Sequence, residues 1–372
     1  HLFNNWSKRA PNTWSFPLYV ANGVTGVREM AAGPDDIARV NRWRAAVDDG
    51  TLVAPHILAA GVVSYGSTAE AVQRAGAAAD VHADFVKVFS NLSAASWHAV
   101  LDEAGKRGLP VAGHVPAGVP VLVAAKAGQR TVEHLTQVFE ACTPIENEVV
   151  DARKALEGAA LDERIEADEP RVLAAFDAGV CDRVAHALAK TPQGQVPALV
   201  RPWFELRPAH DYSIDPRWKY LRPDEHARWE RNAVQLTPEQ RTTGAERWNV
   251  ARQIAAALHR ANVPLVAGTD SPMPDVYPGW ALHDELERLV DVGLTPAEAL
   301  RAATLAPAKL FGIATDFGTI APGKRADLVL LDADPLHDIR NTRRIDGVVL
   351  DGRWLDRAAL DALLANAAKA AE

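Results

Sequence analysis

The chain has 372 residues, of which 48% are hydrophobic and 24% charged, and its formal net charge is -8. These values are ordinary for a soluble globular protein, and the length allows one large barrel plus a small appendage. The acidic balance and the lack of basic runs argue against a nucleic-acid partner. No apolar stretch reaches the roughly 18 residues that a membrane span needs, so we expect no membrane partner either.

Neither end of the chain assigns a compartment. The first residue is His1 rather than Met, and no signal peptide is visible, so cytoplasmic and exported locations both stay open. The chain has two cysteines, Cys142 and Cys181. They form one bridge if they meet in an oxidising compartment, and two buried thiols are the alternative.

Short apolar segments without alternation recur along the chain. Runs of this kind are typical of parallel strands that are buried on both faces. The expected strands begin near Leu18, Leu52, Phe85, Leu109, Thr131, Val196 and Val263. We expect the sixth over 196–200 and a further strand before Leu2, because an eight-stranded barrel needs one more.

Helix-like stretches follow most of these segments. Residues 93–107 predict a helix that Ser93 or Ser96 caps and Gly108 ends, and residues 119–127 predict another. A third is expected directly after Thr295, where a proline and a glutamate complete a capping box. Strand and helix alternating at intervals of roughly 25 to 30 residues indicate βα units.

Two long, charged segments, 141–191 and 202–262, interrupt this alternation. We expect helices and loops there that cover the mouth of the barrel. The second segment contains tryptophans at positions 203, 218, 229 and 248. They could wall an apolar substrate pocket, although packing of the segment onto the barrel is the more common reason for such residues.

The sequence pattern changes after Gly312. Asp351 and Gly352 lie between short apolar runs and predict a hairpin, and residues 357–372 predict an Ala-rich terminal helix. We therefore expect a barrel over 1–313 and a small β module with a terminal helix over 314–372.

Four of the expected strands end in side chains that bind metals or form carbamates. These residues are Lys87, His114, His134 and Asp270, in that order along the chain. Because the strand ends of a β/α barrel meet at one face, this order predicts a metal site there. The alternatives are ordinary ones: a paired strand-end lysine, hydrogen-bonded core histidines, and an aspartate that caps a helix.

The motifs together resemble the amidohydrolase superfamily, in particular its imidazolonepropionase and prolidase-like branch. The matching segments are 23–29, 86–88, 113–116, 132–135, 268–271, 294–304 and 318–329, which span nearly the whole chain. Each motif is weak alone, and their order and spacing are specific. The resemblance implies a (β/α)8 TIM barrel with a small, partial β-sandwich.

The family pattern begins with His-x-His at the end of the first strand, and His1-Leu2 looks like its second half. If so, the first histidine and the first strand lie upstream of His1, which the upstream codons would reveal. The resemblance implies two divalent ions, with zinc the expected metal although Mn, Co and Fe suit the same ligands. His1 and Asp270 would hold one ion, and His114 and His134 the other.

The resemblance also implies that Lys87 becomes a carbamate that bridges both ions. A lysine among apolar neighbours and cations favours its neutral amine, which can add CO2. Asp270 would have a second, catalytic role, because a carboxylate beside metal-activated water can take its proton and pass it to the leaving amine.

Four further residues are candidates for substrate binding. Arg28 would bind a substrate carboxylate or pair with a barrel acid, and His283 would lie near the site or on a helix surface. Tyr65 and Asn91 are weaker candidates from loops at the expected mouth.

These observations predict a metal-dependent hydrolase in which metal-activated hydroxide cleaves the C–N bond of dipeptides, N-acyl amino acids or related small amides. Hydrolysis of cyclic amides, lactones or carbamates is the nearest alternative. An alternative of another class is a truncated, non-catalytic barrel or binding protein. The expected partner is a small-molecule substrate, and a homo-oligomer stays open.

Overall fold

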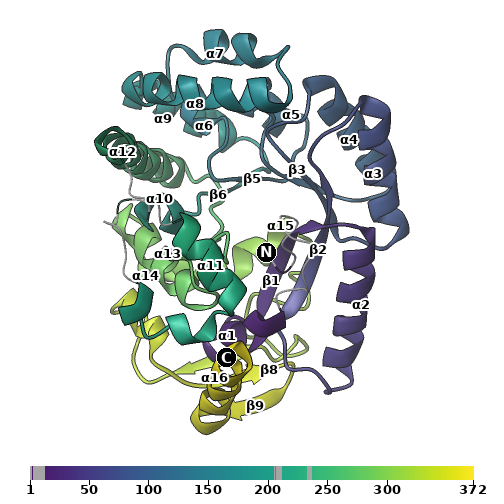
Figure 1. The fold of residues 1–372 in the computed structure, drawn as a ribbon, viewed down its shortest axis with the longest axis vertical. Helices are drawn as coiled ribbons and strands as arrows, with labels where there is room; N and C mark the ends of the chain where they lie inside the picture. Colours follow the sequence, from purple (N-terminus) through teal and green to yellow (C-terminus); the bar gives the residue numbers. More distant parts are fainter. Residues whose placement is uncertain (1, 3–12, 205, 207–211, 233–236) are drawn as a thin grey trace.

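The fold is known from a computed structural model, which describes residues 2, 13–204, 206, 212–232 and 237–372. Parallel strands occupy the middle of the molecule, with helices α2, α3 and α4 along one side (Figure 1). Helices α7 to α9 lie at one end of that view, and the last strands with α16 lie at the other. The chain therefore has an α/β architecture.

Six parallel strands carry this architecture. Four of them pair in chain order in one sheet and two in a second sheet; their bounds are β1 Gly26–Ala32, β2 His56–Val63, β3 Phe85–Val88, β4 Val111–Gly113, β5 Thr131–Glu133 and β6 Gly194–Val196. The amide of Arg130 donates to Val111 O at 2.6 Å and so links β5 to β4. A parallel bridge between Gln195 and Leu265 places the seventh expected segment beside β6.

Helices pack outside these strands. Those of the first half are α1 Phe16–Ala21, α2 Pro34–Asp48, α3 Thr68–Asp80, α4 Ala94–Lys106, α5 Val121–Lys126, α6 Val138–Ala141, α7 Glu146–Arg153, α8 Gly158–Ala174 and α9 Ala178–Leu188. Those of the second half are α10 Val200–Phe204, α11 Pro223–Asn232, α12 Pro238–Arg260, α13 Trp280–Asp291, α14 Pro296–Ala303, α15 Leu305–Leu310 and α16 Arg357–Ala371. Among the described helices, none is long and apolar enough to cross a membrane.

The capping signals in the sequence are confirmed. Ser93 accepts the amide of Ser96 at the start of α4. Thr295 accepts the amide of Glu298, whose side chain bonds back to the Thr295 amide, so α14 begins with a complete capping box. A side chain that satisfies a free helical amide fixes the starting residue of the helix, which is why these boundaries were readable.

Three strand predictions are wrong. The run at Val263 makes only the isolated bridge at Leu265 and is not a strand. The apolar run at Leu18 is helix α1, and the first described strand of the sheet begins only at Gly26. The run at 196–200 is the end of β6 followed by the first residue of α10. A short run that is buried on all sides has no periodicity that separates strand from helix, and Pro17 in the first turn favours the helix.

The first long segment folds as helices α6 to α9, and Cys142 and Cys181 form a disulfide that joins the end of α6 to α9. Of the two alternatives for these cysteines, the structure therefore has the bridge. The tryptophans of the second segment serve packing. Trp229 is fully buried against Tyr212 and Tyr277, and Trp218 stacks on Tyr212 at 4.8 Å between ring centroids.

The C-terminal module contains one antiparallel sheet of β7 Leu328–Leu331, β8 Ile345–Leu350 and β9 Arg353–Asp356. The predicted hairpin joins β8 to β9, and the predicted terminal helix is α16. Residues of α1, β8 and α16 share one apolar cluster, so the C-terminal module packs against helix α1. Closure of an eight-stranded barrel, a complete β-sandwich and the domain boundary at 313/314 stay predictions.

Candidate metal centre

Lys87 lies in the middle of β3, and its side chain is buried. The neighbouring strand makes room for it with Gly113, whose φ is +120°. A Cβ at Gly113 would lie 2.5 Å from Lys87 Cδ and 2.3 Å from Val88 O, both closer than atoms can approach. Glycine is therefore required at this position for a long side chain to lie across the sheet.

His114 and His134 directly follow β4 and β5. The His114 amide donates to Val88 O and the His134 amide to Val196 O, each at 2.9 Å, so neighbouring strands fix both backbones. The two rings lie 5.4 Å apart between centroids at an interplanar angle of 83°. The structure thus brings the two predicted histidines together.

The ring nitrogens of these histidines differ in their partners. His114 Nδ1 lies 3.1 Å from Ser90 Oγ, which orients that ring. His134 Nε2 lies 3.6 Å from Asp270 Oδ2, whereas its Nδ1 is buried and has no hydrogen-bond partner among the described residues. A buried nitrogen without a partner costs free energy unless something else binds it, so this atom is suited to a ligand.

Burial controls the protonation of this group. It lowers the pKa of His114 well below its usual value, and the cations of Lys87 and His134 lower it further. Burial also lowers the pKa of His134 to about 4, although Asp270 opposes the shift. Both imidazoles are therefore neutral near pH 7, which is the form that binds metals.

Burial likewise lowers the pKa of Lys87, although the nearby carboxylates of Glu133 and Asp270 oppose this. A lowered pKa increases the fraction of neutral amine, which is the form that adds CO2. These couplings also show that Lys87 and Asp270 lie close enough to influence each other, in spite of their separation along the chain.

Asp270 has a left-handed backbone, with φ of 59°, and its side chain is mostly buried. Arg201 Nη1 donates to Asp270 Oδ2 at 3.2 Å. His134 has a left-handed φ of 59° as well. Non-glycine residues rarely adopt this conformation, and such residues cluster at functional sites.

Glu133 also belongs to the group, although it entered the sequence analysis only as part of a motif. Its Oε1 lies 3.1 Å from Arg28 Nη1 and accepts from Thr131 Oγ1 at 2.8 Å. Burial opposes its ionisation, but the Arg28 and Lys87 cations hold the pKa of Glu133 below its usual value. Of the two roles foreseen for Arg28, the structure therefore shows the pair with a barrel acid.

The other predicted residues are not brought to this group. Tyr65 is 66% exposed and packs against Arg74, and Asn91 donates to Asp162 at 3.0 Å. His283 is buried, so a surface position is wrong; its ring nitrogens lie 3.0 Å from Thr342 Oγ1 and 3.1 Å from Asn22 O. His1 lies outside the described residues, and its role as a ligand stays a prediction.

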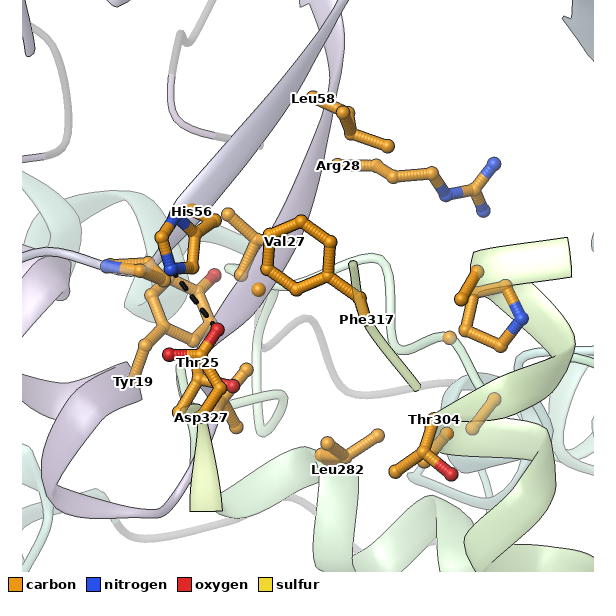
Figure 2. Close-up of a pocket in the computed structure, with 18 of the residues that line it drawn as sticks. Tyr19, Thr25, Val27, Arg28, His56, Leu58, Leu282, Thr304, Phe317 and Asp327 are labelled. Atoms are coloured by element: carbon orange, nitrogen blue, oxygen red, sulfur yellow. Dashed lines mark ion pairs between the residues drawn. The ribbon is translucent and has the colours of Figure 1, made fainter. Parts of the chain in front are cut away.

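A cavity of about 1250 Å³ opens beside the group and is lined by Lys87, His134 and Asp270 at one end. It continues between β1, β2 and the C-terminal module (Figure 2). There His56 Nε2 pairs with Asp327 Oδ2 at 3.0 Å, with the Phe317 ring beside it. The volume is sufficient for a small-molecule ligand.

The donor set suits a divalent metal. Two neutral imidazoles, one of them with a buried nitrogen that has no hydrogen-bond partner among the described residues, lie near a carboxylate and a lysine whose pKa burial lowers. Among the described residues, no three His, Cys, Asp or Glu side chains surround a single point as ligands. A carbamate on Lys87 would supply a further oxygen ligand, and the predicted ligand His1 lies outside the described residues.

The chain is similar to known proteins over part of its sequence and over most of its fold. Residues 227–355 match the model of the Amidohydrolase family. A segment of 86 residues is 44% identical to adenine deaminase 2 of Rhizobium meliloti, and it covers 23% of this chain but only 13% of that enzyme. The chain therefore corresponds to a small part of this relative.

Two solved structures share the fold over nearly the whole chain. The bottromycin amidohydrolase is 23% identical with a TM-score of 0.71, covering 96% of this chain and 77% of that one. A Xaa-Pro dipeptidase is 19% identical with a TM-score of 0.63, covering 92% and 78%. These structures therefore show the fold of this chain, and the family model matches it over residues 227–355.

Proposed function

We propose that the protein is a metal-dependent hydrolase that cleaves the C–N bond of small amides, such as dipeptides and N-acyl amino acids. The observation that carries this proposal is the convergence of Lys87, His114, His134 and Asp270 at neighbouring strand ends. Four polar residues from distant parts of the chain would not gather in a largely buried region merely to stabilise a core, because burying polar groups without partners is unfavourable.

His114 and His134, with a carbamate on Lys87, would hold one divalent ion. Asp270 and His1, with the same carbamate, would hold a second, and zinc is the expected metal. Bound divalent ions would lower the pKa of water and polarise the carbonyl of the substrate. Ser90 supports this set from outside, because its bond to His114 Nδ1 leaves Nε2 as the nitrogen for a ligand.

Asp270 would move the proton. Its carboxylate would accept a proton as the water oxygen adds to the carbonyl carbon, and would return it to the nitrogen as the C–N bond breaks. Its contacts with His134 and Arg201 support this role, because they keep the carboxylate beside the candidate ligands. The similarity to a Xaa-Pro dipeptidase supports dipeptides as a first choice of substrate.

The same resemblance supports a closed barrel over 1–313 and a β-sandwich over 314–372. The observed order of parallel strands, with the segment at Leu265 beside β6, is what such a barrel requires. The antiparallel sheet β7–β9 would form one half of the sandwich.

The test combines metal analysis with activity. The protein is purified, its metal content is measured, and a panel of dipeptides, N-acyl amino acids and adenine is assayed for release of the free amine or ammonia. We expect at least one bound divalent ion per chain and turnover of an amide. The Asp270→Asn variant should lose most of this activity, and full activity in that variant would contradict the proposed proton transfer.

A further inference from the structure

Helix α10 begins four residues after β6 ends and carries Arg201 to the candidate metal centre. Arg201 Nη1 donates to Asp270 Oδ2 at 3.2 Å. Its cation also lies near enough to His114 and His134 to lower their pKa values, behind the larger effect of burial. Arg201 is therefore part of the electrostatic environment of the site, although nothing in the sequence drew attention to it.

Arg201 is more exposed than the residues it accompanies. Its side chain is 36% exposed, whereas those of Asp270 and His134 are 14% and 17% exposed. Among the described residues, its contact with Asp270 runs through Nη1 alone rather than through two parallel bonds. A guanidinium has five N–H donors in a fixed plane, so one contact leaves it able to bind a second anion.

A buried carboxyl group, whose pKa burial raises to about 8, holds the start of this helix. Glu285 lies on α13, is fully buried, and its Oε2 accepts the amide of Val200 at 2.7 Å. The amide of Leu199 also contributes a bond to this carboxyl group. An oxygen that accepts the first amides of a helix holds its first turn in place, and Arg201 is the next residue.

The other side of α10 is fixed as well. The guanidinium of Arg288 lies 4.4 Å from the centroid of the Trp203 ring. Val200 and Phe204 pack with Val276 and Ala281 in one apolar cluster. With its backbone bonded to Glu285 and its apolar side chains packed, α10 presents Arg201 from a rigid support, which is how binding residues are kept in place.

Glu285 makes only part of the contacts that a carboxyl group can make. Its Oε1 is buried and has no hydrogen-bond partner among the described residues. Leaving a buried polar oxygen unpaired is unfavourable, and a leucine of similar volume would avoid it. Packing alone therefore does not explain a glutamate at this position, whereas its bonds to the amides at the start of α10 do.

We infer that Arg201 is a specificity-determining residue that binds an anionic group of the substrate beside Asp270, and that Glu285 is the positioning residue that holds it there. This inference rests on the proposed function and narrows it to amides that carry a carboxylate close to the scissile C–N bond. A neutral amide of the same shape would leave the guanidinium without its second anion and would bind more weakly.

The experiment compares two substrates that differ in one group. One is an N-acyl amino acid, and the other is the N-acyl amine that lacks only the carboxylate. For Arg201→Leu, we expect kcat/KM of the acid to fall about 10- to 100-fold, mainly through KM, as for loss of one charged hydrogen bond. The value for the amine should fall less, through the lost contact with Asp270 alone, so the ratio of the two kcat/KM values should fall about 10-fold.

Variants of Glu285 test the positioning role. Glu285→Leu should reduce the preference for the acid by about 10-fold, and Glu285→Gln, which keeps an acceptor oxygen for the Val200 amide, should restore it. In the double variant with Arg201→Leu, the change at Glu285 should have no further effect on the preference, because both substitutions remove the same interaction between Arg201 and the substrate carboxylate. A residue that only stabilises the fold would affect both substrates equally.

Each outcome decides a different point. If the unmodified protein cleaves both substrates and Arg201→Leu slows both equally, the inference is overturned and the proposed function stands. If the two substitutions have additive effects on the preference, the role of Glu285 is overturned. If the metal-loaded protein cleaves neither the acid and amine nor any amide of the panel, the proposed function fails and the inference fails with it. If Glu285→Leu does not fold, the test uses Glu285→Gln, which must keep the preference for the acid over the amine that Arg201→Leu loses.

Discussion

Two histidines that line the cavity, His134 and His283, have different surroundings. His134, after β5, has one ring nitrogen 3.6 Å from Asp270 and another that is buried without a hydrogen-bond partner among the described residues. His283, on α13, has a partner for each nitrogen, at 3.0 Å and 3.1 Å. Burial lowers the pKa of both residues to about 4, so neither burial nor titration distinguishes them.

The difference is whether the protein itself satisfies the ring. At His283, the ring joins α13 to Asn22 and Thr342, which is a structural role. At His134, the protein leaves a donor or acceptor position open beside a carboxylate, which is an arrangement that a ligand completes. Hydrogen-bond partners, rather than burial, therefore separate a structural histidine from a candidate ligand.

The largest expected effect is on activity. Replacing His134 by Asn should lower kcat/KM by at least about 10³-fold, or about 4 kcal/mol of transition-state stabilisation, because a metal ligand is lost. The fold should be retained, as judged by circular dichroism and by the unfolding midpoint. Activity within a few-fold of the unmodified protein would remove His134 from the site.

The next largest effect is on the free energy of unfolding, through Gly113 of β4, which makes room for Lys87. Gly113→Ala should destabilise the protein by about 2–3 kcal/mol, because it adds a Cβ at a positive φ and against Val88 O. Urea unfolding measures this. Gly105→Ala is the matched control, since Gly105 lies in α4 with nothing within 4 Å of an added Cβ. A neutral Gly113→Ala would mean that Lys87 does not cross the sheet there.

The smallest effect sharpens the contrast with His283. His283→Leu should cost about 1–2 kcal/mol, because the Thr342 hydroxyl and the Asn22 carbonyl lose their buried partner. Turnover per folded molecule should be unchanged. A 10³-fold loss of activity in a folded His283→Leu protein would give this residue the role that we assign to His134.

The pH dependence of stability provides a second measurement on His283. Burial, helped by the Arg343 cation, lowers its folded pKa from 6.5 to about 4. A depressed folded pKa of a base gives stability that is present above pH 6.5 and is lost as the pH falls toward 4. Unfolding midpoints at pH 7 and pH 5 should therefore differ more for the unmodified protein than for His283→Leu. Equal differences would show that His283 does not titrate in this window.

Much of the fold was predictable from local sequence. The caps at Ser93 and Thr295 and the turn at Asp351-Gly352 specify structure through bonds within a few residues, so these elements are confirmed. The run at Leu18 was misread because a short, fully buried segment looks the same as a strand or a helix. Its identity depends on tertiary packing with β8 and α16, which the local sequence does not contain.

The candidate site was also predictable only in part. The strand-end residues Lys87, His114, His134 and Asp270 were predictable as a group, because topology alone brings strand ends together. Arg201 and Glu285 were not, because their contacts join residues 69 and 85 positions apart and no motif marks them. The ligand roles of the strand-end residues stay predictions until a metal is observed.

The most direct test is an anomalous diffraction map of crystals of the zinc-loaded protein. We predict a peak about 2.0–2.1 Å from a ring nitrogen of His114 and of His134, next to extra density for a carbamate on Lys87. A map with no metal at this point, or with these side chains turned away from one another, would contradict the metal centre and the activity proposed from it.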